Sequence, residues 1–173
     1  MADGIVIRNA TVDDAVALAA IYAPYVRDTA VSFEIEPPTS SEFAKRITRT
    51  LERFPYLVAE WDGVVAGYAY AGPFKERAAY DTSVELSVYI AASFKGRGVG
   101  RALYTALERE LALRGKTNLY ACIAYPPAED DYLTYASVRF HERMGFSIVG
   151  RFHGCARKFG RTYDMVWMEK LTR

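Results

Sequence analysis

Apolar side chains recur every three or four residues in several stretches of the chain, which is the spacing of an amphipathic helix. In the first stretch Leu18 and Tyr22 share a face, and Thr11 is placed to cap the helix start. In the second, a capping box begins at Thr39. The pattern predicts a helix after Thr11, one from Thr39 to Pro55, one from a glycine run to Gly115, and a short one from Ser137 to Met144, closed by Gly145.

Other stretches alternate apolar and polar residues or carry a short apolar run, as β-strands do. We predict a hairpin over residues 56–72 that turns at Asp62-Gly63. Further strands are expected over 4–10, 83–90, 117–125, 146–152 and 163–171, and residues 29–38 are expected to be extended. The elements predict one α/β (α+β) domain over residues 1–173. Its sheet should be mixed, mostly antiparallel and twisted, with helices on both faces.

Composition and charge narrow the function classes. Of the 173 residues, 51% are hydrophobic and 25% charged, which is ordinary for a soluble globular protein, and the formal net charge is +1. This charge gives no reason to expect nucleic acid or an anionic membrane as a partner. No apolar run reaches the roughly 18 residues that span a bilayer. The N-terminal residues lack the pattern of a secretory signal, so we expect a cytoplasmic protein.

The cysteines and histidines are few. Cys122, Cys155, His141 and His153 have no metal-ligand spacing, so no metal site is expected. Two free thiols are favoured over a disulfide. Cys122 is predicted to be a small core residue on a strand, and His153 a surface residue.

A glycine-rich stretch carries the first functional signal. Residues 93–115 read SFKGRGVGRALYTALERELALRG, with three glycines directly before a predicted helix. Free N–H groups at a helix start suit a phosphate. The run fits neither the P-loop nor the G-x-G-x-x-G pattern, but it fits [QRK]-x-x-G-x-G after a strand, as Lys95-x-x-Gly98-x-Gly100. We predict a phosphate-binding loop, with a plain surface turn as the alternative.

This stretch resembles the acetyl-CoA pyrophosphate loop of the GNAT acyltransferase superfamily. The wider resemblance, over nearly the whole chain, is to the phosphinothricin-type amino-acid N-acetyltransferases. It is carried by FPYLVAEWDGVVAGYAYAGPFKERAAYD, SVELSVYI, ALYTALE, SVRFHERMGF and ARKFGRTYDMVW. The resemblance implies acetyl-CoA as cofactor. It assigns cofactor binding to the main chain of Leu86 and Val88 and to Lys95, Gly96, Arg97, Gly98, Val99, Gly100, Arg101 and Ser137, the last of which we also expect to cap its helix.

Two residues are candidates for catalysis. Glu85 alternates with apolar residues on the strand that leads to the glycine loop, so its side chain should lie on the face opposite the core face. A carboxylate there can take the proton from an ammonium group, and the resemblance implies this role; the alternative is an exposed surface residue. His141 stands where the phosphinothricin-type enzymes carry a histidine. An imidazolium could protonate the leaving thiolate near neutral pH.

A loop between strands offers groups for the acceptor substrate. Lys75, Arg77 and Tyr80 lie in PFKERAAYD, and an arginine can hold a carboxylate with two hydrogen bonds. A solvated loop is the alternative reading. The resemblance implies that the same loop contacts substrate and that Phe33 lines the pocket. It also implies a tryptophan where this chain has Phe74.

One segment departs from the family pattern. Residues 126–136 replace a short Asn-Asp-Pro with a longer loop that carries Glu129, Asp130 and Asp131, and Thr134 stands in place of the asparagine. The departure puts phosphinothricin itself in doubt as a substrate. The acids form either a solvated loop or a selector for a cationic acceptor.

The sequence thus predicts an acetyl-CoA-dependent N-acetyltransferase that acts by direct transfer on a small amine, an amino acid or an analogue of one. The alternatives are a protein N-terminal or ribosomal-protein acetyltransferase and a non-catalytic acyl-CoA-binding sensor. A homodimer is expected, because a C-terminal strand is predicted to expose Met165, Val166 and Trp167.

Overall fold

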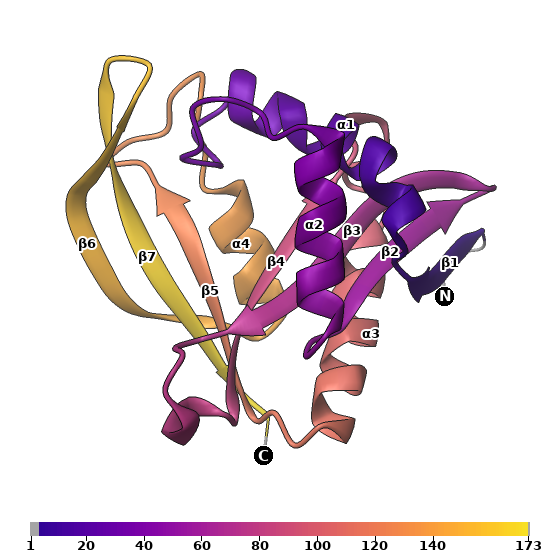
Figure 1. Cartoon of the computed structure of the whole chain (residues 1–173). Helices are drawn as coiled ribbons and strands as arrows, with labels where there is room; N and C mark the ends of the chain where they lie inside the picture. The colour runs from indigo at the N-terminus through magenta and orange to yellow at the C-terminus, as the bar shows by residue number, and fades with distance from the viewer. Residues whose placement is uncertain (1–3, 173) are drawn as a thin grey trace.

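The computed structural model describes residues 4–172, and Figure 1 shows helices packed around one twisted sheet. The helices are α1 (Ala15–Arg27), α2 (Ser40–Leu51), α3 (Val99–Leu113) and α4 (Ala136–Arg143). The strands are β1 (Ile5–Asn9), β2 (Tyr56–Trp61), β3 (Val64–Pro73), β4 (Ser83–Ile90), β5 (Asn118–Tyr125), β6 (Ser147–Lys158) and β7 (Arg161–Leu171). Most elements predicted from periodicity are present within a few residues of the expected bounds.

The seven strands lie in the order β1-β2-β3-β4-β5-β7-β6. Neighbours run antiparallel except β4 and β5, which are parallel. This pair is short: only Ser83–Glu85 and Asn118–Tyr120 are in register. Figure 1 shows the two strands diverging beyond that contact. The backbone groups of the second half of β4 on the β5 side therefore lack a strand partner, which opens the sheet at its centre.

Helices cover both faces of the sheet, as the sequence predicts. On one face α3 buries Leu103, Leu107 and Leu111 against the strands. On the other face α1 and α2 bury Leu18 and Ile47, each fully excluded from solvent. Burial of each leucine or isoleucine side chain stabilises the fold by roughly 1.5–3 kcal/mol. The mixed, mostly antiparallel α/β sheet between two helical layers confirms the predicted fold class.

The turn between β2 and β3 lies where the sequence places it. Asp62 and Gly63 both have positive φ, 49° and 80°, the conformation of a type I′ turn. Separately, no helix in the range 4–172 combines the length and the apolar character needed to cross a membrane.

Two sequence-based expectations about strands are wrong. Residues 29–38 contain bends but no strand. The last two strands extend further than predicted and form one long hairpin with its tip at Phe159 and Gly160. Val166 is fully buried rather than exposed, because its face of β7 packs into the core that contains α3, and Met165 and Trp167 on the other face are half-buried. The exposed edge is β6 instead, which the alternation of β7 alone could not reveal.

Candidate active site

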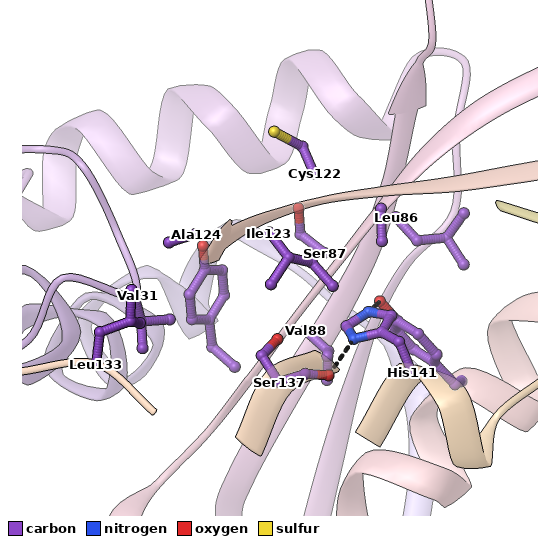
Figure 2. Close-up of a pocket in the computed structure, with 13 residues that line it drawn as sticks. Val31, Leu86, Ser87, Val88, Cys122, Ile123, Ala124, Leu133, Ser137 and His141 are labelled. Carbon is purple, nitrogen blue, oxygen red and sulfur yellow. Dashed lines mark hydrogen bonds between the residues drawn. The ribbon is translucent and has the colours of Figure 1, made fainter. Parts of the chain in front are cut away.

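The divergence of β4 and β5 leaves a cavity of about 60 Å³ at the centre of the sheet. Leu86–Tyr89 line it from β4, Ala121–Ala124 from β5, and Ser137 and His141 from α4 (Figure 2). The free backbone of β4 thus faces an open space in which an extended ligand can pair with it as a strand would. The cavity brings together Leu86, Val88, Ser137 and His141, four of the residues singled out from the sequence.

Glu85 lies next to this cavity, on the face predicted by the alternation along β4. Val84 and Leu86 are buried against α3, so the half-buried Glu85 side chain projects from the opposite face. Burial raises the pKa of the Glu85 carboxyl, and the nearby Lys75 ammonium partly opposes this shift. A carboxyl whose pKa is raised toward neutrality is a stronger base than an ordinary surface glutamate.

His141 is buried, with 4% of its surface exposed, and its hydrogen bonds fix its tautomer. Nδ1 lies 2.8 Å from the Ser137 carbonyl oxygen, which can only accept, so Nδ1 carries a proton (Figure 2). Nε2 lies 2.9 Å from the Tyr104 hydroxyl, which therefore donates to it in the neutral ring. Burial lowers the pKa of His141 to about 4. The expectation of an imidazolium near neutral pH is wrong: the ring is neutral there.

Tyr104 is a site residue that the sequence analysis missed. It is fully buried on α3 and lines the cavity beside His141. Its helical spacing with Leu103 and Leu107 made it look like a core residue. One feature of the sequence could have identified it: a tyrosine at a core position needs a hydrogen-bond partner for its buried hydroxyl.

The buried His141 should make stability depend on pH. The folded-state pKa of about 4 lies below the ordinary value of 6.5, so the unfolded chain binds the extra proton. The stabilising contribution is therefore complete above pH 6.5 and is lost as pH falls toward 4, by about 3 kcal/mol. Urea unfolding at pH 7 and pH 5 should show about 2 kcal/mol of this loss. His141→Phe should lose less stability between these pH values than wild type. His153 Nδ1 lies 3.4 Å from the Asp164 carboxylate, but the histidine side chain is 77% exposed, so the pair contributes little and His153→Ala should lose close to the wild-type amount. Equal losses in all three proteins would contradict the assignment.

The glycine run forms the predicted loop at the start of α3. Gly96 and Gly98 have φ of +75° and +86°, and a Cβ at either position would meet nothing within 4 Å. Gly98 is the residue that precedes the first helical turn. The loop therefore presents free backbone N–H groups toward open space, which suits a phosphate. Gly100 differs, because a Cβ there would lie 3.2 Å from the Phe140 ring, so close packing also requires its glycine.

Two basic side chains of the glycine loop pack over aromatic rings. The Lys95 ammonium is 4.5 Å from the centre of the Tyr25 ring, and the Arg97 guanidinium is 5.8 Å from Trp61. Arg101 is exposed on the first turn of α3, beside the buried Val99. Three cations thus surround the N–H groups, and the loop and cavity together fit a ligand that carries phosphates at one end and a thin extended arm at the other.

The residues predicted to bind the acceptor lie in two places: three are in the loop that follows β3, and Phe33 is in the segment between α1 and α2. Lys75 lies over the Phe74 ring, 5.1 Å from its centre, and Tyr80 packs edge-on against the same ring. This places Lys75 where its charge acts on Glu85. Arg77 is exposed and forms no ion pair within residues 4–172. Phe33 packs near Tyr163, in the small cluster that also contains cavity-lining Leu133.

The acidic loop does not present three free carboxylates. Asp130 forms an ion pair with Arg161 at 2.9 Å and accepts the Tyr163 hydroxyl at 3.0 Å. Glu129 pairs with Arg139. Only Asp131 of the three forms no ion pair within the described range. Two of the acids therefore hold the loop to its neighbours, and the structure gives no support to the idea that the loop selects a cationic acceptor.

Two further residues differ from expectation. Tyr135, not Ser137, precedes α4, and Ser137 contributes its carbonyl to His141 instead of a cap. Cys122 is not a core residue, because its side chain is partly exposed and lines the cavity (Figure 2). Burial and the nearby Glu85 carboxylate raise the pKa of its thiol to about 12, so it is not a thiolate at neutral pH. Both cysteines are free, as predicted.

Comparison with known protein families finds a match to an acetyltransferase domain. The model of the acetyltransferase (GNAT) domain matches residues 7–167. The phosphinothricin N-acetyltransferase of Streptomyces viridochromogenes is 37% identical over 164 residues, which cover 95% of this chain and 86% of the relative.

Solved structures agree with this comparison. The phosphinothricin acetyltransferase of Sinorhizobium meliloti, in complex with AcCoA, superposes with a TM-score of 0.88 at 29% identity, over 98% of this chain and 89% of that one. A ribosomal-protein-alanine N-acetyltransferase from Brucella melitensis superposes with a TM-score of 0.86 at 35% identity, over 96% and 99% of the two chains.

Proposed function

The chain belongs to the GNAT acetyltransferase family, and we propose that it transfers the acetyl group of acetyl-CoA directly to the amine of a small amino acid or amino-acid analogue. The observation that carries the proposal is the half-buried Glu85, whose pKa burial raises. It lies beside a cavity that opens between β4 and β5 and ends near His141.

The residues of the site fit acetyl-CoA. Backbone N–H groups from Arg97 to Arg101 would hold the pyrophosphate, because Gly96 and Gly98 leave the space in front of them open. The unpaired main chain of Leu86 and Val88 would bind the pantetheine arm, with Ser137 and Lys95 as further contacts. Acetyl-CoA supplies an activated acyl group, and the chain needs no nucleophile of its own for direct transfer.

The side chains then have separate roles. Glu85 accepts the proton that the acceptor's ammonium group must lose before it can attack. Neutral His141 has no proton to give, since Nδ1–H is bound to the Ser137 carbonyl. It instead orients the Tyr104 hydroxyl at the inner end of the cavity. We propose that His141 positions the Tyr104 hydroxyl, which lines the cavity that would hold the thioester end of acetyl-CoA.

The acceptor loop supplies a test of the substrate class. If Arg77 holds the acceptor's carboxylate, Arg77→Ala should raise the KM for an amino-acid acceptor by roughly tenfold or more, the loss of a hydrogen bond to a charged group. The KM for acetyl-CoA should change much less. Steady-state kinetics with free amino acids, methionine sulfone and short peptides measure both constants. Arg109→Ala, at an exposed position of α3, is the matched control. Equal changes in both constants would remove Arg77 from acceptor binding.

The Brucella structure favours a second candidate, acetylation of a protein N-terminus. The same acceptor panel separates the two. Turnover of free amino acids with none of peptides supports the small-acceptor function, and the reverse result establishes the second candidate. Binding of acetyl-CoA without turnover of any amine would instead indicate a sensor.

We also propose a cytoplasmic homodimer. Strand β6 lies at the edge of the sheet and exposes Ile148, Val149 and Phe152, each by 44–53% of its surface. An exposed edge strand with apolar side chains is a surface that proteins cover by pairing with another strand. A second copy of this chain offers the same edge, which makes a two-fold interface possible.

A further inference from the structure

A second cavity, of about 240 Å³, lies between α2 and the sheet. Its walls carry five of the 13 tyrosines of the chain: Tyr22, Tyr56, Tyr68, Tyr70 and Tyr89. The rings of Tyr56 and Tyr70 are stacked at 4.9 Å, and those of Tyr56 and Tyr68 at 5.8 Å. We call this space the tyrosine cavity. Its volume is several times the share of one liquid water, so it admits a group of several heavy atoms.

Of the five cavity tyrosines only Tyr22 forms a hydrogen bond through its hydroxyl within residues 4–172, to Ser32, and Tyr56 and Tyr68 are the most buried of the other four. Tyr56 and Tyr68 are 2% and 1% exposed, and neither hydroxyl forms a hydrogen bond with a residue in the range 4–172. Neither oxygen is sealed from solvent, because no fully enclosed side-chain polar atom without a partner occurs in that range. The small accessible surface that remains therefore opens onto the cavity. Burial raises the pKa of both phenols, so each keeps its proton and can donate it.

The tyrosine cavity adjoins the candidate active site. Tyr89 lines both this cavity and the one between β4 and β5. Tyr70 on β3 is in register with Ser87 on β4, and Gly72 with Glu85, so Tyr70 and Glu85 share a face of the sheet on adjacent strands. The Glu85 carboxylate contributes to the raised pKa of Tyr70. An acceptor whose amine meets Glu85 can extend its other end toward these rings.

The tyrosine cavity is also lined by three charged side chains. Arg46 forms ion pairs with Glu34 at 2.9 Å and with Glu42 at 3.3 Å. Arg49 is exposed and forms no ion pair within the described range. An entering cation would meet two guanidinium groups, so the walls disfavour a positively charged end group. They favour a group that accepts hydrogen bonds from phenols.

We propose that the tyrosine cavity is the subsite for the side chain of the acceptor, and that it selects an oxygen-bearing end group without positive charge, such as a sulfone. This inference rests on the proposed function, because it assumes an amino-acid acceptor bound at Glu85. It adds Tyr56 and Tyr68 as the residues that determine specificity. Neither was singled out by the sequence, where both looked like ordinary strand residues.

Methionine sulfone and methionine form the sharpest probe pair, since they differ only in the two oxygens on sulfur. The ratio of kcat/KM for the sulfone to that for methionine should fall by roughly three- to tenfold in Tyr56→Phe and in Tyr68→Phe, the effect of one lost hydrogen bond. Each phenylalanine keeps the ring and the stacking. Tyr125→Phe is the matched control, because its hydroxyl also lacks a described partner but lies outside the cavity. The Kd for acetyl-CoA should be unchanged in all variants.

Calorimetric binding of methionine sulfone adds a readout that does not need turnover. Weaker binding in Tyr56→Phe and Tyr68→Phe, with normal binding in Tyr125→Phe, supports the subsite even if no amine is acetylated, and in that case the proposed function alone fails. If wild type acetylates both amino acids and the ratio is the same in every variant, the subsite is wrong and the proposed function stands. Absence of both binding and turnover overturns both.

Discussion

Replacement of Glu85 by Gln is expected to lower kcat by roughly 10²–10⁴-fold at neutral pH. The substitution keeps the size of the side chain and its place on β4, but it removes the group that accepts the proton from the ammonium. Binding of acetyl-CoA should change little, because Glu85 projects away from the glycine loop on the face opposite Leu86.

The pH dependence of this loss identifies the role of the carboxylate. Glu85 works when it is deprotonated, and its pKa is raised above 4.5, so the wild-type rate should fall at a higher pH than for an ordinary glutamate. In Glu85→Gln the limb set by this carboxyl should disappear, and the rate should instead follow the fraction of the acceptor present as free amine. At high pH the free amine is available without a base, so the variant should recover part of its rate.

A pH–rate profile of wild type, Glu85→Gln and Glu52→Gln decides the matter. Glu52 is exposed at the end of α2 and forms no ion pair in the described part of the chain, so its variant should match wild type. A constant loss from pH 7 to pH 10 would mean that Glu85 shapes the site without accepting a proton. An unchanged rate would return the residue to an ordinary surface position.

The parts of the site that the sequence predicts are those encoded locally. The alternation along β4 places Glu85 on the face opposite the core, and the spacing of Lys95, Gly98 and Gly100 before a helix predicts the loop geometry. Each inference needs only neighbouring residues and the fixed period of a strand or helix. For the same reason the order of elements and the fold class are confirmed.

What the sequence could not supply depends on contacts between distant residues. The Nε2 atom of His141 meets the Tyr104 hydroxyl, 37 positions away in the chain, and the low pKa of the ring follows from burial rather than from its neighbours in the chain. The tyrosine cavity gathers residues from α1, β2, β3 and β4. The burial of Val166 follows from the packing of its face of β7 into the core that contains α3, which periodicity along one strand does not reveal.

Gly98→Val is expected to raise the Kd for acetyl-CoA by about ten- to a hundredfold, the effect of roughly 1–3 kcal/mol. The φ of +86° at Gly98 is unfavourable for a β-branched residue, so the loop must change its conformation. A side chain at this position would also enter the open space in front of the N–H groups. Both effects move the backbone donors away from the pyrophosphate.

Backbone strain at a glycine of positive φ lowers the stability of the protein whether or not the glycine belongs to a binding loop. Gly115 provides the control for this effect. It lies just beyond the C-terminal end of α3 with φ of +69°, and a Cβ there also meets nothing within 4 Å. Gly115→Val should therefore lose a comparable amount of stability in thermal unfolding but keep the wild-type Kd in calorimetry. Gly100→Val is a poorer test, because its side chain would also collide with Phe140. If Gly98→Val and Gly115→Val bind acetyl-CoA equally well, the left-handed glycine at the start of α3 serves only to turn the chain, and the pyrophosphate must be held elsewhere.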